Sequence, residues 1–489
     1  MILAIDQGTT GTTCIVFDEH GRPCGRAYSE FEQHFPRPGW VEHDAAEIWD
    51  VTRDVAAKAL EAAGIKGADL AGIGITNQRE TVVAWDPETA EPLHHALVWQ
   101  DRRTAGRCDA LKAEGREPLF RERTGLVLDP YFSGTKIEWL LKEGGVDPGA
   151  AFGTIDSWLL RKLTGTHVTD YSNASRTLLF DIRKLAWDEE LCEILGVPPA
   201  SLPEPLPSAH AYGETTEFGG SVPVAGIAGD QQAALYGQAC HSPGLGKNTY
   251  GTGSFVLENA GDSAPEAQEG LLTTVAWGVG ERVDYALEAA IFVTGAAVQW
   301  LRDGLGIIGA ADESEALARS LESNDGVYFV PALTGLGSPH WDPYARGTIV
   351  GLTRGNGRAH LARAALEAIA YQTADAVRAM EAASGLRLEE LKADGGAAVN
   401  SWLMQFQADV LGVPVVVPEV SETTALGAAY LAGVAVGQWS EDDVRSMWRE
   451  AARYEPQMSG DERETLLSEW QMAMDVTKSN QLGRQDVSG

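Results

Sequence analysis

Asp6-Gln-Gly-Thr-Thr-Gly-Thr-Thr13 stands between two short apolar runs, ILAI at residues 2–5 and CIVFD at residues 14–18. Apolar runs of this length on either side of a polar, glycine-rich turn are typical of a β-hairpin. The consecutive N–H groups and hydroxyls of the turn can surround phosphate oxygens without a positively charged side chain. Asp6 ends the first run, where a carboxylate can hold Mg²⁺ through water. An ordinary hairpin turn is the alternative, because Asp, Gly and Thr are common in turns.

A similar turn recurs near the middle of the chain. Residues 247–258 (KNTYGTGSFVLE) form a second expected hairpin, with Gly251-Thr-Gly253 at its turn. One phosphate-sized turn in each half favours phosphate binding over two ordinary turns, and it predicts two related domains that face a shared cleft. We place the boundary near residue 240, so that the domains span residues 1–240 and 241–489.

Short apolar strands alternate with amphipathic helices over most of the remaining chain, which is the pattern of an α/β protein. The expected elements are strands at 70–76, 222–228 and 391–394, helices at 44–63, 231–239 and 360–384, a proline-rich exposed loop at 198–207, and a polar helical tail at 440–478. The first two strands end in the polar clusters NQRE and GDQQ, which makes those strand ends candidates for a site.

Composition excludes several classes of function. The 489 residues carry 70 acidic and 38 basic side chains, a formal net charge of −32, which argues against nucleic acid or anionic membranes as partners. Five scattered cysteines without a CxxC pair suggest neither a zinc site nor a disulfide framework. No signal peptide or transmembrane run is recognisable, so we expect a cytoplasmic protein of two or more domains.

Charged residues at the strand ends indicate the chemistry. Arg79 and Glu80 offer a donor fork beside an acceptor, which suits a ligand with neighbouring hydroxyls, although a surface ion pair explains them equally well. Asp230 can accept a hydroxyl proton during phosphoryl transfer, or it can cap the helix that follows. Residues 394–400 (DGGAAVN) and 295–299 (GAAVQ) allow a nucleotide to approach the backbone, with a plain strand-to-helix turn and close helix packing as the alternatives.

Two longer motifs show that the chain resembles the FGGY family of carbohydrate kinases. Residues 131–140 (YFSGTKIEWL) fit the first family signature, and residues 347–352 (GTIVGL) with 360–367 (HLARAALE) fit the second. The similarity runs from end to end, and the segments 77–81, 98–103, 129–132 and 228–232 resemble the members that phosphorylate glycerol. The resemblance implies an α/β fold of two ribonuclease H-like, actin-like ATPase domains flanking an active-site cleft.

The same resemblance implies ATP-dependent phosphorylation of glycerol to sn-glycerol 3-phosphate, the first step of glycerol catabolism. The first domain would hold the glycerol pocket and the first phosphate turn, and the second domain the remaining nucleotide contacts. Asp230 would be the catalytic base and Asp6 would help hold Mg²⁺. Glycerol would contact Arg79, Glu80, Trp99, Tyr131, Asp230, Gln231 and Phe255, and ATP would contact Thr9, Thr10, Gly11, Thr252, Gly295, Gln299, Gly396 and Asn400. A homo-oligomer, either a dimer or a tetramer, is also expected.

Two alternatives stay open at this point. A related kinase would phosphorylate another polyol, a ketose or a sugar acid by the same chemistry. An actin-like ATPase switch without an acceptor would leave Arg79, Glu80, Tyr131 and Asp230 without a role.

The sequence departs from the family pattern in two places. Thr13 stands where the family usually has an arginine that reaches the nucleotide phosphates, so a cation beside the phosphates is missing. Some bacterial members bind an allosteric sugar bisphosphate through a basic, glycine-rich loop. The corresponding residues 217–223 (EFGGSVP) contain neither lysine nor arginine. We therefore predict no inhibition by fructose 1,6-bisphosphate through this loop.

Overall fold

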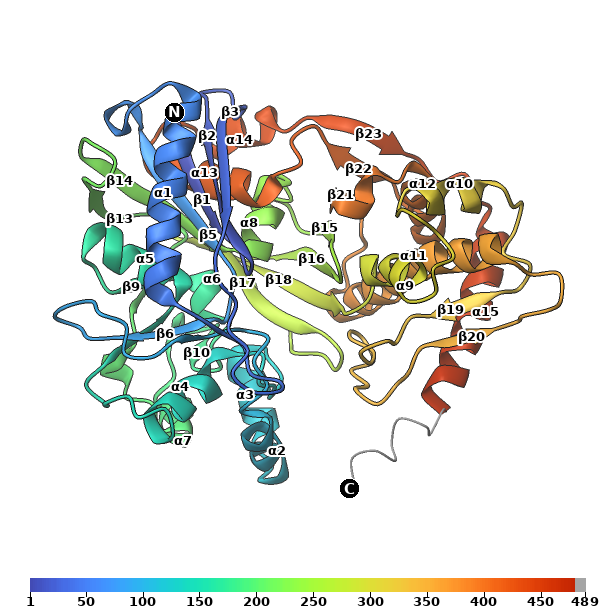
Figure 1. Ribbon diagram of the computed structural model, residues 1–489, viewed down its shortest axis with the longest axis horizontal. Coiled ribbons are helices and arrows are strands. Elements are labelled where there is room, and N and C mark those ends of the chain that lie inside the picture. Colours follow the sequence, from blue (N-terminus) through green and yellow to red (C-terminus); the bar gives the residue numbers. More distant parts are fainter. Residues whose placement is uncertain (480–489) are drawn as a thin grey trace.

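The computed structural model describes residues 1–479, and its main feature is a 13-stranded sheet to which both halves of the chain contribute (Figure 1). In the first half the strand order is β3-β2-β1-β5-β14. These strands are β1 (Ile2–Gln7), β2 (Gly11–Phe17), β3 (Pro23–Glu30), β5 (Gly72–Asn77) and β14 (Val222–Gly229). The strands β1, β5 and β14 run parallel, whereas β1, β2 and β3 form an antiparallel meander.

The second half repeats this arrangement. Its strand order is β18-β16-β15-β21-β22, again with a parallel set of three and an antiparallel meander of three. These strands are β15 (Leu245–Tyr250), β16 (Ser254–Gly261), β18 (Arg282–Ile291), β21 (Glu390–Gly395) and β22 (Val415–Pro418). β17 (Leu272–Val279) and β13 (Ala209–Thr215) join the halves, and β23 (Glu450–Tyr454) forms one edge. The shared strand order confirms the expectation of an α/β protein built from two related halves.

The side chains of β1 point alternately to the two faces of the sheet, which explains why helices cover both faces of the sheet in the first half. Leu3 and Ile5 pack with α1 (Ala45–Ala63) and α5 (Ile155–Thr164) on one face. Ile2 and Ala4 pack with α8 (Asp230–Gly237) and α13 (Thr423–Ala435) on the other. Successive side chains of a strand point to opposite faces, so an apolar run such as ILAI must be covered twice.

Helices of the second half form a separate core, shown in yellow to red in Figure 1. They are α9 (Gly295–Asp303), α10 (Glu313–Arg319), α11 (Arg358–Ser384), α12 (Ser401–Leu411) and α15 (Gly460–Ser479), with β19 (Tyr328–Val330) paired to β20 (Thr348–Val350) beside them. α14 (Glu441–Met447) instead lies with the first half through Val444, which packs among side chains of β1, β2 and α8.

The remaining short elements of the first half, apart from β4, lie within residues 82–206. They are β4 (Glu42–His43), β6 (Val82–Trp85), β7 (Ala96–Leu97), β8 (Ala151–Thr154), β9 (Val168–Asp170), β10 (Phe180–Asp181), β11 (Ala186–Trp187), β12 (Glu204–Leu206), and the helices α2 (Ala105–Ala113), α3 (Glu117–Thr124), α4 (Ser133–Lys142), α6 (Tyr171–Ala174) and α7 (Glu189–Leu195). Within residues 1–479, none of the helices combines the length and the apolar character that crossing a bilayer requires.

Both hairpins and the long helices occur where the sequence predicts them, and Asp44 caps α1 by accepting from the Ala46 and Glu47 amides. Two expectations were wrong. Residues 198–207 are not simply an exposed loop, because they contain β12, which pairs with β9, and Ser201 and Leu202 are buried. The expected helical tail at 440–478 is interrupted by β23, which pairs with β22. In both cases the partner strand is distant in sequence, so no local pattern reports the pairing.

Candidate active site

The polar clusters predicted at two strand ends meet at one edge of the sheet. β1, β5 and β14 are parallel neighbours, so their carboxyl ends, and the turn that follows β1, lie together. Arg79 Nε lies 3.1 Å from Asp230 Oδ1, and the side chains of Arg79 and Glu80 are only 2% and 1% exposed. The alternative of a surface ion pair is therefore wrong. The structure instead places a buried guanidinium beside the predicted base.

Four buried charged residues form the centre of this site, and we call them the buried charge cluster: Arg79, Glu80, Arg176 and Glu288. Arg79 Nη1 donates to Glu288 Oε2 over 2.6 Å and Arg79 Nη2 donates to Glu288 Oε1 over 3.1 Å. Arg176 Nη2 donates to Glu288 Oε1 over 3.0 Å, and Arg176 Nε donates to Glu80 Oε1 over 2.7 Å. Arg176 and Glu288 were not predicted from the sequence. The one available signal for Glu288 was a carboxylate inside the apolar strand YALEAAI.

The pKa values of the two carboxylates in the buried charge cluster are shifted in opposite directions. Burial disfavours the charged form of Glu288, but the Arg176 and Arg79 guanidiniums outweigh burial and lower the pKa of Glu288 to about 2. For Glu80 burial prevails over Arg79 and Arg176, and the pKa lies above its ordinary value. Glu80 also has a φ of 62°, a strained left-handed conformation for a residue with a side chain. Such strain is concentrated at sites where the surrounding structure fixes a residue for function.

Aromatic side chains form a wall beside Arg79. Tyr131 precedes α4, and its hydroxyl accepts from Arg79 Nη2 over 3.4 Å. The Trp99 and Tyr131 rings pack edge to face with centroids 5.6 Å apart, and Arg79 lies 5.9 Å from the centroid of Phe255. Trp99 Nε1 donates to Thr9 Oγ1 over 2.9 Å. The wall therefore joins the charged residues to the first glycine-rich turn.

Asp230 is the first residue of α8, whereas Gly229 occupies the cap position. The Asp230 Oδ1 nevertheless accepts from the Gln231 amide over 2.8 Å, so the carboxylate also pairs with an amide at the start of the helix. The Asp230 side chain is 34% exposed, and its Oδ2 accepts from Gln231 Nε2 over 3.2 Å. Gln231 Oε1 accepts in turn from Lys247 Nζ over 2.5 Å, and Lys247 also donates to Thr249 over 2.8 Å. Lys247 was not predicted, and burial lowers its pKa to about 8 against the attraction of Asp394 and Asp230.

A backbone hydrogen bond and a close approach to Tyr28 shape the first turn. The Gly8 amide donates to the Gly11 carbonyl over 3.0 Å, which closes the turn. A Cβ on Gly11 would lie 2.7 Å from the Tyr28 ring, so only glycine fits there. Thr13 pairs with Asp6 across β1 and β2, so the arginine that the family usually has at this position would lie next to that carboxylate.

Asp6 is the candidate metal ligand. Burial and then the negative charge of Asp230 raise the pKa of Asp6 to about 7. Residues 1–479 contain no group of three or more His, Cys, Asp or Glu side chains that could hold a metal. A single carboxylate fits Mg²⁺ held mainly by water and phosphate oxygens, since Mg²⁺ keeps several waters and binds through one or two carboxylates.

Some of the residues predicted to contact the nucleotide lie around the second turn. The Gly251 amide donates to the Gly253 carbonyl over 2.8 Å, and the Gly295 amide at the start of α9 donates to the Gly251 carbonyl over 3.1 Å. A Cβ on Gly295 would lie 2.5 Å from that carbonyl. β21 runs parallel to β15 and ends at Gly395, beside Tyr250. The structure therefore brings together Thr252, Gly295 and Gly396. Gln299 lies one turn further along α9, and Asn400 caps α12 by accepting from the Leu403 amide over 2.9 Å.

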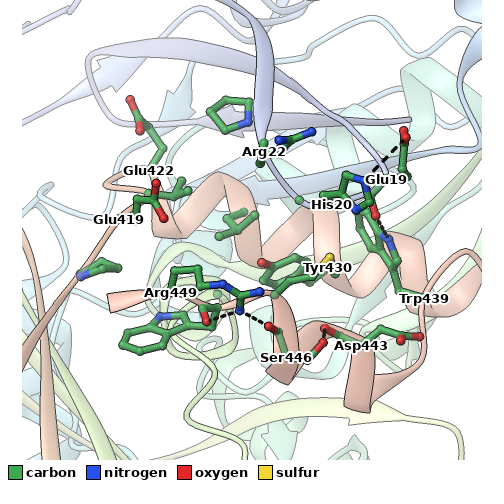
Figure 2. Close-up of a pocket in the computed structure, with 18 of the residues that line it drawn as sticks. Glu19, His20, Arg22, Glu419, Glu422, Tyr430, Trp439, Asp443, Ser446 and Arg449 are labelled. Carbon is green, nitrogen blue, oxygen red and sulfur yellow. Dashed lines mark hydrogen bonds and ion pairs between the residues drawn. The ribbon is translucent and has the colours of Figure 1, made fainter. Parts of the chain in front are cut away.

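A cavity of about 880 Å³ lies elsewhere, between the β2–β3 turn and the segment containing α13 and α14 (Figure 2). Its lining includes Tyr430, Trp439 and Arg449, and it includes none of the predicted site residues. Gly237, at the carboxyl end of α8, also lines it, whereas Asp230 lies at the opposite end of the same helix. The cavity is thus separate from the candidate active site.

Comparison with known proteins gives matches over almost the entire chain. Residues 1–237 match the N-terminal domain of the FGGY family of carbohydrate kinases, and residues 246–436 match its C-terminal domain. Glycerol kinase 2 of Thermotoga maritima is 57% identical over 484 residues, covering 97% of this chain and 98% of the relative. Glycerol kinase of Deinococcus radiodurans is also 57% identical, covering 97% and 96%. The crystal structure of Plasmodium falciparum glycerol kinase with ADP is 36% identical with a TM-score of 0.93, covering 97% of this chain and 98% of that one.

Proposed function

The chain belongs to the FGGY family of carbohydrate kinases, and from this we propose that it transfers the γ-phosphoryl group of ATP to glycerol, forming sn-glycerol 3-phosphate and ADP. The structural observation that carries the proposal is the arrangement of Arg79, Glu80 and Asp230 at one edge of the sheet. A buried donor fork, a buried acceptor and a partly exposed carboxylate are what a small polyol needs at the acceptor side of a kinase.

Glycerol has little apolar surface, so its recognition depends on hydrogen bonds. Arg79 and Glu80 would pair with neighbouring hydroxyls, while Trp99, Tyr131 and Phe255 would contact the carbon chain. An acceptor that left one of the buried groups unpaired would lose much of its binding energy, because unpaired buried polar groups are costly.

Phosphoryl transfer then needs one proton acceptor. Asp230 would take the proton of the terminal hydroxyl as its oxygen attacks the γ-phosphorus. The bond from that phosphorus to the bridging oxygen breaks, and its electron pair leaves with ADP. Gln231, held by Lys247, would keep the Asp230 carboxylate turned toward the hydroxyl.

The two glycine-rich turns would hold the phosphates. Backbone N–H groups and hydroxyls of Thr9, Thr10, Gly11 and Thr252 would surround the phosphate oxygens, and Gly295, Gln299, Gly396 and Asn400 would contact the rest of the nucleotide. Mg²⁺ bound through Asp6 and water would neutralise charge on the phosphates. The homo-oligomeric state belongs to the same proposal, because it comes from the family resemblance, and the cytoplasmic location stays an expectation.

A coupled ADP-release assay tests the proposal, with glycerol, dihydroxyacetone, xylulose, ribulose and gluconate as acceptors. We expect the highest kcat/KM with glycerol. Asp230→Asn should lower kcat by about 10²- to 10⁴-fold, the usual contribution of a general base. Asp303→Asn, which changes an exposed carboxylate paired with Arg302, should leave kcat unchanged.

Other outcomes would each reject a part of the proposal. A preference for a pentulose would assign the chain to another branch of the family. ADP release that does not depend on any acceptor would contradict the kinase function itself.

A further inference from the structure

We propose that Glu288 is a positioning residue for the acceptor site, because it holds Arg79 and Arg176 in the orientations in which they face Asp230 and Glu80. This inference rests on the proposed function. It assigns a role to a residue that none of the sequence motifs includes, and it predicts an effect on glycerol rather than on ATP.

Both carboxylate oxygens of Glu288 are used. The two terminal nitrogens of Arg79 donate to Glu288 over 2.6 Å and 3.1 Å, which turns the remaining nitrogen, Nε, toward Asp230 at 3.1 Å. Such a bidentate pair fixes the plane of a guanidinium and not only its position. Gln232 Oε1 accepts from Arg79 Nη1 over 3.2 Å and completes this arrangement.

Arg176 contacts Glu288 from the other side through a single hydrogen bond, and among residues 1–479 its Nη1 has no hydrogen-bond partner. Glu288 accepts from Arg176 Nη2 over 3.0 Å, and Arg176 Nε then donates to Glu80 over 2.7 Å. Glu288 therefore lies at the centre of the buried charge cluster, while the two residues proposed to meet glycerol, Arg79 and Glu80, lie at its ends. The side chains of Arg176 and Glu288 are 0% exposed, so water does not replace a missing partner there.

Loss of the Glu288 charge would leave two buried guanidiniums facing one buried carboxylate. A buried charge that loses its partner is strongly unfavourable, and the neighbouring groups rearrange to compensate for it. The carboxylates nearest to Arg79 would then be Glu80, at 3.8 Å, and Asp230. Arg79 would turn its donors onto these groups, which the acceptor needs for its own hydroxyls.

The position of Glu288 in the fold supports a role beyond packing. It lies on β18, where its register partners are Leu257 of β16 and Leu272 of β17. A carboxylate in such an apolar setting is unfavourable unless it is paired. β18 belongs to the region matched by the C-terminal family domain, whereas Arg79 and Arg176 belong to the N-terminal one. Figure 1 shows β18 near the middle of the sheet, between the two halves. One half of the chain thus supports the acceptor site of the other.

The test compares Glu288→Gln with a matched control, Glu258→Gln. Glu258 is a buried glutamate on the neighbouring strand β16, and the polar side chain that contacts it is Ser384 at 3.2 Å. We expect Glu288→Gln to raise the KM for glycerol at least tenfold and to lower kcat, with the KM for ATP within twofold of the unaltered chain. Glycerol binding without ATP, measured by calorimetry, should weaken by the same factor. Glu258→Gln should leave all of these values within twofold.

An unchanged KM for glycerol in a folded Glu288→Gln protein would overturn the inference. Equal increases in the KM for glycerol and in the KM for ATP would overturn it too, because they would indicate a general structural defect. If Glu288→Gln does not fold, Glu288→Asp keeps the charge but shortens the reach to the guanidiniums. The Glu288→Asp variant must then raise the KM for glycerol, and an unchanged KM for glycerol in this variant overturns the inference. Failure of the unaltered chain to phosphorylate glycerol would instead reject the proposed function, so the two failures are distinguishable.

Discussion

At the scale of single residues, Glu258 shows what an unpaired buried carboxylate costs. Among the described residues 1–479, its Oε2 has no hydrogen-bond partner and no cation forms an ion pair with it. Burial is the main reason that its pKa rises from 4.5 to about 7. The Glu288 carboxylate, equally buried, has the opposite shift because two guanidiniums face it. Between Glu258 and Glu288, the two guanidiniums account for the opposite sign of the shift, whereas at Glu80 burial outweighs its counter-charges.

This difference predicts a pH-dependent gain in stability for Glu258→Gln. Between pH 4.5 and 7 the folded chain keeps the Glu258 proton while the unfolded chain releases it, so this residue lowers the free energy of unfolding as the pH rises. Glutamine removes the effect. At pH 8 we expect Glu258→Gln to be more stable by about 1 to 2 kcal/mol, with the difference disappearing near pH 4.5. Thermal unfolding of both proteins at pH 5 and pH 8 measures it, and an equal difference at both pH values would contradict the assignment.

The residues of the site that belong to a sequence motif could be predicted, and those outside a motif could not. Arg79, Glu80 and Asp230 follow strands that the sequence marks clearly, so their meeting at one sheet edge could be expected. Glu288 is 209 positions away from Arg79, and Lys247 contacts Gln231 only because β15 lies beside α8 in the fold. Pairings of this kind depend on the tertiary fold, and a charged residue within an apolar strand is the only local sign of them. The roles assigned to the predicted residues stay predictions.

At the scale of elements, the contact between α8 and α13 links the site to the rest of the molecule. Asp230 begins α8, and α13 packs against α8 and against β1, β5 and β14. Two glycines allow the close approach of the helices. A Cβ on Gly427 would overlap the carbonyl oxygen of Ala233, and a Cβ on Gly237 would overlap that of Thr423. The position of the predicted base therefore depends on an interface that tolerates no larger side chain.

Gly427→Ala tests this dependence. The added methyl group meets a backbone carbonyl that cannot rotate away, so we expect a loss of at least about 2 kcal/mol in the free energy of unfolding, together with a lower kcat. Gly106→Ala on α2 is the matched control, since no atom lies within 4 Å of its Cβ position. Alanine favours a helix over glycine by about 0.5 to 1 kcal/mol, so the control should be slightly stabilised. Equal stability of the two variants in urea unfolding would show that the helices can separate at no cost.

Elements were predictable from sequence where the pattern is local. The hairpins at residues 2–18 and 247–258 and the helices α1 and α11 follow from turn residues, a cap and apolar spacing. β12 and β23 were missed because each is short and exists through pairing with a strand that lies far away in sequence. Local propensity cannot decide such cases.

At the scale of the whole molecule, the two halves are connected by more than their shared sheet. α13, from the region matched by the C-terminal family domain, covers strands of the first half, and Glu288 of the second half supports Arg79 and Arg176 of the first. Two related halves were predictable from the two glycine-rich turns. These cross-connections were not, because they join residues more than a hundred positions apart. The domain boundary near residue 240 stays a prediction.

Two features argue against regulation by a sugar bisphosphate: the net charge of the chain and the loop at residues 216–221. Residues 216–221 connect β13 to β14, and the Phe218 carbonyl accepts from the Gly67 amide over 3.1 Å. The connection is exposed apart from the half-buried Phe218 and includes Glu217, and no lysine or arginine occurs between residues 211 and 229. Lys66 borders the contact, but one lysine is a single point charge, whereas phosphate recognition usually needs several converging donors. The net charge of −32 adds a general repulsion of anions.

We therefore expect fructose 1,6-bisphosphate to leave the rate of glycerol phosphorylation unchanged across the millimolar range. The measurement is the initial rate at fixed glycerol and ATP with increasing bisphosphate, repeated at low ionic strength, where any electrostatic binding is strongest. A variant in which residues 218–221 are replaced by alanine serves as the control for the loop. Inhibition of the unaltered chain that disappears in this variant would contradict the prediction, because it would show that backbone amides of the loop bind the bisphosphate without a basic side chain. Inhibition that persists in the variant would place the effector elsewhere and would leave the loop without a regulatory role.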